Sequence, residues 1–209
     1  MEVTLSSISP VVKKIALEKP FGSSEKDFEE LEKALKKIFR EEEIFYVDHY
    51  LGKATVQNLI ILKAENLFIE KLLSRDLVKE VRIAVSEKEG VGERKKFYEE
   101  TGAIKDILQN HLLQLFTLLA IDIPPLCEED RKECQRFLEN VAQAKSQLLT
   151  QIQLPPQEAI YLGQYEHYRE EVGNPHSQVE TLVYLPLYLS SKRWQGVPFR
   201  MLTGKKMAE

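Results

Sequence analysis

The stretch Asp48-His49-Tyr50-Leu51-Gly52-Lys53 decides how the fold of this chain is interpreted. The apolar run Ile44–Val47 before it is typical of a buried strand, and Thr55–Ile60 after it is typical of a helix. A carboxylate, an imidazole, a phenol and an ammonium group therefore follow a strand and precede a helix. In α/β sheets, the space beyond the carboxyl ends of the strands is the usual ligand crevice. The sequence therefore predicts a ligand site at this junction.

The charges in this stretch suit an anion. His49 and Lys53 are four residues apart, so they can converge on one anion if the helix begins at Gly52. The start of a helix adds free N–H groups and a partial positive charge. Asp48 could instead orient an imidazole from another segment. The open alternative is that Asp48 caps the helix while His49 and Lys53 are solvated surface groups.

Length and composition bound the class of protein. The 209 residues suit one large domain, or one and a half smaller ones, and 43% hydrophobic residues can build a core. A net charge of −4 and a pI near 5.7 argue against non-specific binding of nucleic acid. Cys127 and Cys134 form neither a disulfide framework nor a zinc pattern, which favours reduced thiols in a cytoplasmic protein. The apolar run Leu112–Ile121 is too short to span a bilayer, and Met1–Pro10 lacks the pattern of a signal peptide, so no membrane partner is expected.

The N-terminal part predicts a strand, a turn and a helix. The strand is expected at Val11–Leu17, and the turn after it at Glu18–Gly22. Proline restricts the residue before it to extended geometry, so Pro20 would hold Lys19 at the strand end. A plain surface lysine is the open alternative. Ser23 or Ser24 is expected to cap the next helix, with Asp27 completing a capping box for Ser24.

The middle of the chain predicts two helices and a strand. The helices are expected at Thr55–Lys63 and Asn66–Ser74, and the strand at Leu77–Ser86. Val81, Ile83 and Val85 alternate along the strand and should share one face. Glu87 ends this strand, before a Gly-rich corner, and by itself is typical of a solvated edge residue.

The longest helical pattern runs from Phe97 to Leu119, with a break expected near Gly102. Polar residues, among them Asp106 and His111, interrupt its wide apolar stripe. Polar groups on such a face cost stability unless they are paired. A single histidine there is most often a core residue, but several polar groups of complementary type favour a functional site.

The remaining elements are one helix and three strands. The helix is expected at Glu128–Leu149, and strands at Ala159–Tyr165, Glu180–Ser190 and Val197–Leu202, with a hairpin connection at Ser191–Gly196.

Five blocks of this chain, in this order and with these spacings, resemble the glucose-6-phosphate dehydrogenase family. The blocks are Glu18-Lys19-Pro20-Phe21-Gly22, Asp48 to Lys53, Asp106 to Gln114, Gly163-Gln164-Tyr165 and Arg193 to Phe199. The resemblance covers almost all of this chain but only the middle of the family's chain. The Gly-rich G-x-G-x-x-G turn of a nucleotide-binding domain is absent. The sequence is therefore expected to be a fragment or a truncated relative.

The resemblance implies an α+β fold. Residues 1–47 would be the last strand–helix portion of a Rossmann-type coenzyme domain. Residues 48–209 would be the substrate-binding and catalytic domain, with helices against a truncated antiparallel sheet. The implied reaction oxidises glucose 6-phosphate at C1 by hydride transfer to NADP, giving 6-phosphogluconolactone, the first step of the pentose phosphate pathway. NADP would be bound mainly by segments absent from this chain, and complete members of the family are homo-oligomers. The alternative is a non-catalytic sugar-phosphate-binding or assembly protein left by truncation.

The resemblance also implies roles for individual residues. His111 would be the general base and Asp48 its carboxylate partner. His49, Tyr50 and Lys53 would hold the 6-phosphate. Glu87 and Asp106 would bind sugar hydroxyls, Lys205 would approach the substrate, and Lys19 would face both sugar phosphate and coenzyme. A metal enzyme using His49 and His111 is disfavoured, because no paired ligand spacing supports it.

Overall fold

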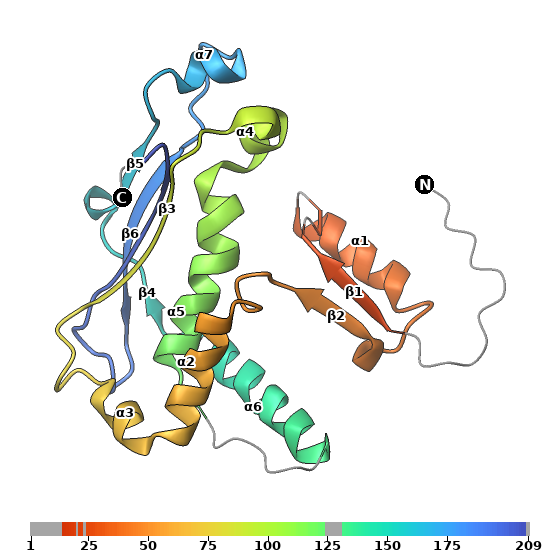
Figure 1. The fold of residues 1–209 in the computed structure, drawn as a ribbon, viewed down its shortest axis with the longest axis vertical. Coiled ribbons are helices and arrows are strands. Elements are labelled where there is room, and N and C mark those ends of the chain that lie inside the picture. The colour runs from red at the N-terminus through yellow and green to blue at the C-terminus, as the bar shows by residue number, and fades with distance from the viewer. Residues whose placement is uncertain (1–13, 20, 23, 124–130, 208–209) are drawn as a thin grey trace. The chain divides into compact units, whose positions relative to one another are not determined.

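The computed structural model describes residues 14–19, 21–22, 24–123 and 131–207. The chain divides into two compact units, Met1–Gly52 (unit 1) and Lys53–Glu209 (unit 2) (Figure 1). Several residues named above lie outside the described part: residues 11–13, Pro20, Ser23, Cys127 and residues 128–130. Within the described part, no helix combines the length and the apolar character that crossing a membrane requires.

The described residues of unit 1 form a two-stranded parallel sheet and one α-helix. Its elements are β1 (Ile15–Glu18), α1 (Glu25–Leu35), a 3₁₀ turn (Glu41–Glu43) and β2 (Ile44–Val47). The predicted capping box is confirmed at Ser24, whose Oγ accepts the Asp27 N–H at 3.2 Å. Asp27 returns the contact, since its Oδ2 accepts the Ser24 N–H at 3.1 Å.

The strand at Ile44–Val47 has the predicted bounds, but the prediction that it is buried is wrong. Phe45 is 45% exposed, and Tyr46 and Val47 are each 41% exposed. The physical reason is that a two-stranded sheet with one helix against it covers only part of its apolar surface. The Tyr46 ring does pack on the helix side, with its centroid 5.2 Å from Phe21 and 5.5 Å from Phe28.

Unit 2 alternates helices with the strands of a larger sheet. Its helices are α2 (Ala54–Glu65), α3 (Leu67–Leu72), α4 (Lys95–Ala103), a π-helix (Ile104–Leu112), α5 (Leu113–Ala120), α6 (Arg131–Leu149) and α7 (Tyr168–Val172), with 3₁₀ turns at Gly92–Arg94 and Gln157–Ala159. Its strands are β3 (Val81–Glu87), β4 (Ile152–Gln153), β5 (Tyr161–Gly163), β6 (Leu182–Leu189) and β7 (Phe199–Lys205). The helices and strands predicted for this region are confirmed, with ends that differ by a few residues.

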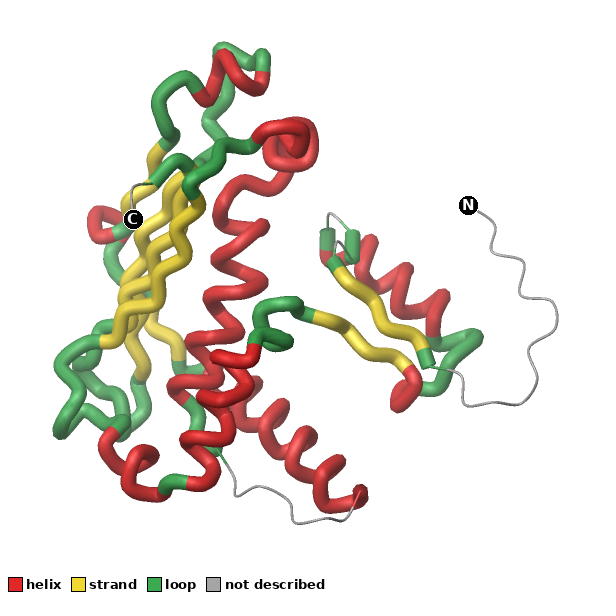
Figure 2. The backbone as a smooth tube through the Cα atoms, in the orientation of Figure 1, coloured by secondary structure: helices red, strands yellow, loops and turns green. Residues whose placement is uncertain are grey.

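The sheet is mixed. Its strand order is β3-β7-β6-β4, and β5 also pairs with β6. β6 is antiparallel to β4, β5 and β7, and the predicted hairpin connection joins β6 to β7. β3 instead pairs with β7 in parallel, an arrangement that the expected antiparallel sheet did not include. Figure 2 shows the yellow strands side by side, along the helical column formed by the π-helix and α5.

The core of unit 2 lies between this helical column and the sheet. Phe116 from α5 and Phe199 from β7 are fully buried, with their ring centroids 4.9 Å apart. Trp194, 1% exposed, packs edge-on against Phe199 at 5.0 Å. Val81 and Ile83 of β3 are buried in the same core, as their alternation predicts. Aromatic packing of this kind fixes the column against the sheet.

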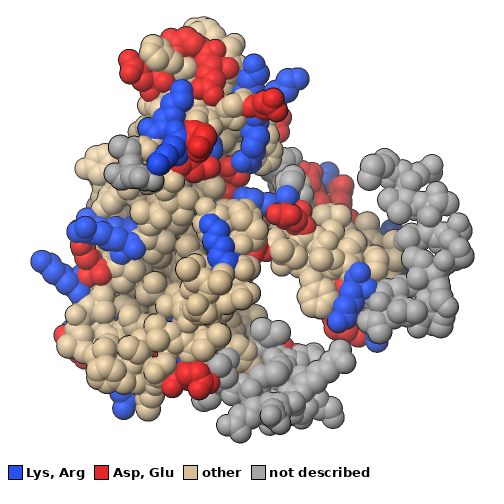
Figure 3. All heavy atoms as spheres, in the orientation of Figure 1, with Lys and Arg blue, Asp and Glu red and all other residues tan. Residues whose placement is uncertain are grey.

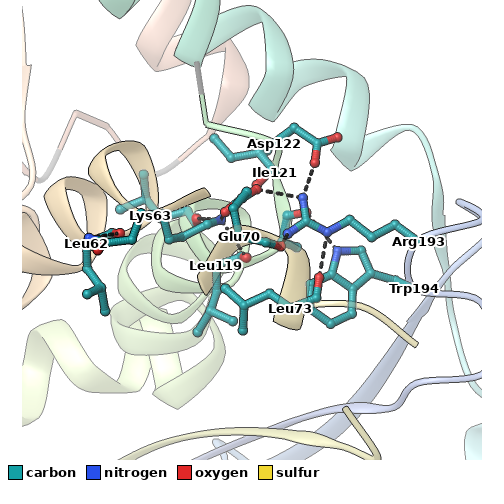
Figure 4. Close-up of polar contacts among 12 residues, drawn as sticks. Leu62, Lys63, Glu70, Leu73, Leu119, Ile121, Asp122, Arg193 and Trp194 are labelled. Carbon is teal, nitrogen blue, oxygen red and sulfur yellow. Dashed lines mark hydrogen bonds and ion pairs between the residues drawn. The ribbon is translucent and has the colours of Figure 1, made fainter. Parts of the chain in front are cut away.

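A buried polar cluster ties α2 and α3 to the end of α5 (Figure 4). Lys63, the buried lysine of α2, is 1% exposed. Its ammonium group donates to three backbone carbonyls at the end of α5, at 2.7–2.9 Å, those of Leu118, Leu119 and Ile121. Arg193, in the β6–β7 connection, pairs with Glu70 of α3 at 2.7 Å and with Asp122. The carbonyls in the last turn of a helix have no backbone N–H partner, and the Lys63 ammonium group supplies the missing donor at the end of α5.

Candidate active site

The candidate residues of unit 1 follow its two strands. Because β1 and β2 are parallel with Glu18 opposite Val47, Lys19 and Asp48 come next at the same edge of the sheet. This is the carboxyl edge, where nucleotides and other ligands bind in parallel α/β sheets. The predicted strand-end position of Lys19 is therefore confirmed.

The residues after β2 form a tight turn. Asp48 Oδ1 accepts the Tyr50 N–H at 2.7 Å, and the Asp48 carbonyl accepts the Leu51 N–H at 3.1 Å. The side chain of His49 is 50% exposed, with Nδ1 3.8 Å from a carboxylate oxygen of Glu18. The His49 and Tyr50 rings meet edge-on at 5.0 Å. An imidazole and a phenol thus lie together at the strand end.

Lys53 is the N-cap residue of α2, and no side chain caps this helix. The alternative in which Asp48 caps the helix is therefore wrong, because the Asp48 carboxylate accepts a backbone N–H within its own turn. Lys53 is exposed and carries its ammonium group at the positive end of a helix. An anion at this position would be attracted both by the Lys53 ammonium group and by the partial positive charge of the helix start.

In unit 2, the parallel pairing of β3 with β7 brings together two predicted site residues that are far apart in the sequence. Glu87 lies opposite Lys205 in the register of the two strands. The Lys205 Nζ donates to Glu87 Oε2 at 2.9 Å, and Lys205 is only 7% exposed. Glu87 is therefore not the solvated edge residue that its local sequence suggests.

Tyr98 is a further candidate residue, which the sequence did not indicate. It comes from α4 and is 1% exposed, and the Lys205 Nζ lies 5.3 Å from its ring centroid. Burial raises the pKa of the Tyr98 phenol far above its usual value, and the negative charges of Asp106 and Glu87 raise it further. The phenol therefore stays protonated. In the sequence, Tyr98 looks like one more aromatic residue of the core.

Asp106 and His111 both lie on the π-helix and are 2% and 1% exposed. The break predicted near Gly102 is confirmed by its non-helical backbone, with φ +60° and ψ −176°. In an α-helix, residues five apart point about 140° away from each other, because each residue turns the chain by about 100°. The i→i+5 hydrogen bonds of a π-helix instead place them about one turn apart. The π-helix therefore suits a site that needs both side chains.

Arg94 is a second residue that the sequence reasoning missed. Its Nη2 donates to Asp106 Oδ1 at 3.2 Å, and its guanidinium group lies 4.9 Å from the ring centroid of Phe97. The side chain of Arg94 is 55% exposed, so it offers Asp106 a charge at the protein surface. The Gly-rich corner before Arg94 predicts a turn but does not indicate this contact.

Unit 2 thus places Glu87, Lys205, Tyr98 and Asp106 near one another, and His111 five residues beyond Asp106 on the same π-helix. Figure 3 shows side chains of both charges around α4 and α7, at the top of the view, while neutral atoms cover much of unit 2 below them. A buried imidazole can take up a proton, and buried carboxylates and an ammonium group can bind hydroxyl groups. The roles of these residues in binding and catalysis stay predictions.

Comparison with known proteins gives a consistent set of matches. A model described as "Glucose-6-phosphate dehydrogenase, C-terminal domain" matches residues 60–209, and one described as "Glucose-6-phosphate dehydrogenase, NAD binding domain" matches residues 3–58. The chain is 35% identical over 208 residues to glucose-6-phosphate 1-dehydrogenase of Mycolicibacterium smegmatis. This match covers 94% of this chain and 41% of the relative. The enzyme of the same name from Rhizobium meliloti is 37% identical over 200 residues, which is 93% of this chain and 41% of the relative.

Solved structures agree. A glucose-6-phosphate dehydrogenase in complex with its substrate glucose-6-phosphate has a TM-score of 0.81 at 29% identity, covering 95% of this chain and 41% of that one. Glucose-6-phosphate 1-dehydrogenase from Mycobacterium avium has a TM-score of 0.75 at 34% identity, covering 92% and 41%. The chain spans about two fifths of the length of these relatives.

Proposed function

This chain belongs to the glucose-6-phosphate dehydrogenase family, and on that premise we propose that the protein oxidises glucose 6-phosphate at C1 with NADP and releases 6-phosphogluconolactone. The observation that carries the proposal is that Asp106 and His111 are both buried on one π-helix, within the part that matches the family's C-terminal domain. A buried imidazole is the kind of group that such a proton transfer needs.

His111 is proposed as the general base. As hydride leaves C1, the carbon gains carbonyl character, so the C1 hydroxyl must lose its proton in the same step. A neutral imidazole accepts that proton near neutral pH and contributes roughly 10²–10⁴-fold to the rate. Asp48 is proposed as the carboxylate that fixes the tautomer of His111 and stabilises its protonated form.

The remaining candidates are proposed to hold the substrate. The 6-phosphate dianion needs charged and polar donors, which we assign to His49, Tyr50 and Lys53. Glu87, Asp106 and Lys205 are assigned to the sugar, since carboxylates accept hydrogen bonds from hydroxyls and an ammonium group donates to them. Each hydrogen bond that involves a charged group contributes roughly 1.5–3 kcal/mol.

The coenzyme is proposed to approach unit 1 at the carboxyl edge of β1 and β2. Lys19 fits this role because it follows β1 at the edge where coenzymes bind in parallel sheets. Its ammonium group would pair with a phosphate of the coenzyme. When bound, NADP supplies the acceptor for the hydride.

The domain organisation, the oligomeric state and the location of the protein stay predictions. The resemblance and the composition imply a domain boundary between residues 47 and 48, with domains at 1–47 and 48–209, a homo-oligomeric state and a cytoplasmic location. NADP is likewise the coenzyme that the family resemblance implies.

The decisive experiment measures turnover and binding together. The protein is purified at the full length in which its source cell makes it and is given glucose 6-phosphate and NADP. The reduced coenzyme is followed by absorbance, while calorimetry measures glucose 6-phosphate binding. We expect turnover in the wild type, and a His111→Asn variant that retains most of the binding but loses turnover. If His111→Asn loses binding as strongly as turnover, His111 is a ligand or a structural residue. Wild-type binding without turnover would favour the sugar-phosphate-binding alternative.

A further inference from the structure

The backbone breaks at Gly102, two residues before the π-helix begins. With φ +60° and ψ −176°, Gly102 interrupts helical geometry inside the last turn of α4, and the π-helix starts at Ile104. A helix start has backbone N–H groups without partners in a preceding turn. The chain before the helix supplies one acceptor, the Thr101 carbonyl for the Ile104 N–H, so the Ala103 N–H and a second bond of Ile104 need an acceptor from elsewhere in the fold.

Glu180 accepts both. Its backbone carbonyl accepts the Ala103 N–H at 3.0 Å, and its Oε1 accepts the Ile104 N–H at 2.9 Å. Glu180 is 76 residues further along the chain than Ile104, just before β6. A carboxylate at this end of a helix is also favoured by the helix dipole.

Gly102 and Glu180 are complementary in shape. A Cβ atom on residue 102 would lie 2.3 Å from Glu180 Oε1 and 2.7 Å from its carboxyl carbon. The carboxylate therefore occupies the space that any other side chain at position 102 would need. The positive φ independently disfavours an L-residue there. Both facts point to a close contact between the helix start and Glu180.

Glu180 is itself anchored next to Lys205. Thr181, which is fully buried, donates its N–H to the Gly163 carbonyl at 2.8 Å and accepts the Lys205 N–H at 2.9 Å. The two adjacent residues Glu180 and Thr181 thus connect the start of the helix that carries Asp106 with the strand that carries Lys205.

We infer that Glu180 is a positioning residue, which holds Asp106 and His111 of the π-helix in place relative to Lys205. Its catalytic meaning rests on the function proposed above. Asp106 is only two residues beyond the N–H that Glu180 accepts. Loss of this anchor would free the helix start to shift its hydrogen-bond register, and an α-helical register would turn Asp106 and His111 away from each other.

The first test does not require activity. Hydrogen exchange of residues 103–112 is compared between the wild type, Glu180→Ala, Glu180→Gln and the control Glu158→Ala, in which an exposed glutamate is removed. Glu180→Ala should accelerate exchange in this segment by about tenfold, the usual effect of losing a helix cap. Glu180→Gln should stay near the wild type, since its amide oxygen still accepts the Ile104 N–H. Unchanged exchange in Glu180→Ala would overturn the inference.

The second test separates positioning from simple stabilisation. With glucose 6-phosphate and NADP, Glu180→Ala should lower kcat/KM by roughly 10–100-fold at a temperature where the variant is folded, because small displacements of catalytic groups are costly. Gly102→Ala, which disturbs the same contact from the other side, should do the same. Gly102→Ala also carries the cost of its positive φ, so the double variant should be no worse than Gly102→Ala alone. A lower melting temperature with unchanged kcat/KM would reduce Glu180 to a structural cap.

The two tests also separate this inference from the proposed function. A wild type that neither binds nor oxidises glucose 6-phosphate would contradict the proposed function, and hydrogen exchange alone would then decide whether Glu180 holds the helix. An active wild type with additive, unrelated effects of Glu180→Ala and Gly102→Ala would overturn the inference and leave the proposed function standing. If Glu180→Ala does not fold, Glu180→Asp, which keeps the charge but withdraws the carboxylate, takes its place in both tests.

Discussion

Replacing Lys63 with methionine should destabilise unit 2 by about 3–5 kcal/mol at pH 7, the usual cost of breaking a buried charged cluster. The ammonium group of Lys63 is the shared donor for the Leu118, Leu119 and Ile121 carbonyls, and it lies 3.6 Å from Glu70 Oε2. Methionine has a similar length but no donor. The carbonyls at the end of α5 would then lack the donor that holds α2 against them, and each buried carbonyl left unsatisfied costs about 1–3 kcal/mol.

The dependence on pH gives this prediction a sign. Burial lowers the pKa of Lys63 from 10.5 to about 8, although Glu70 acts in the opposite direction. The unfolded chain therefore holds this proton more tightly than the folded one, so the contribution of Lys63 to the free energy of unfolding rises between pH 8 and pH 10.5. From pH 8 to about pH 9.5 the rise is about 1.6 kcal/mol, because the slope approaches about 1.4 kcal/mol per pH unit only above the folded pKa. The methionine variant lacks this rise, so its deficit relative to the wild type should grow with pH.

Urea denaturation followed by the fluorescence of Trp194 measures both effects. Trp194 is the single tryptophan of the sequence, and its Nε1 donates to the Ala120 carbonyl at 2.8 Å, beside the Lys63 cluster. Lys71→Met, at an exposed lysine of α3, is the matched control and should change little. A deficit below about 1 kcal/mol at pH 7 would refute the structural argument. A deficit that shrinks from pH 8 to pH 9.5 would refute the lowered pKa.

Two further substitutions test the site and the core. Lys205→Gln should weaken glucose 6-phosphate binding by roughly 10–100-fold in calorimetry, because a charged donor is lost, whereas Lys206→Gln, next in the chain and paired with Glu171, serves as its control. Equal effects of the two changes would argue against a direct role of Lys205. Trp194→Phe should cost about 1–2 kcal/mol in thermal unfolding followed by circular dichroism, since the bond to the Ala120 carbonyl is lost while a ring remains against Phe199. Full wild-type stability in that variant would mean that the hydrogen bond contributes nothing.

Local patterns in the sequence predicted the elements well. The capping box of Ser24 and Asp27, the strand at Ile44–Val47 and the break near Gly102 all depend on residues within a few positions of one another. Such signals act through short-range hydrogen bonds and backbone sterics, which the sequence displays directly. The candidate site residues came from the family resemblance, because no local pattern distinguishes a catalytic histidine from a core histidine.

What the sequence determined by itself was therefore the order of the elements, the apolar faces of helices and strands, and the identity of the family. Tertiary structure alone decided that Glu87 lies opposite Lys205, that Lys63 reaches the end of α5 and that Glu180 holds the start of the π-helix. Each of these contacts joins residues between 55 and 118 positions apart. The sequence did not indicate the π-helix either, whose i→i+5 hydrogen bonds begin just after the break in the backbone at Gly102. The physical reason is that pairing across such distances depends on the packing of whole elements, which local propensity does not encode.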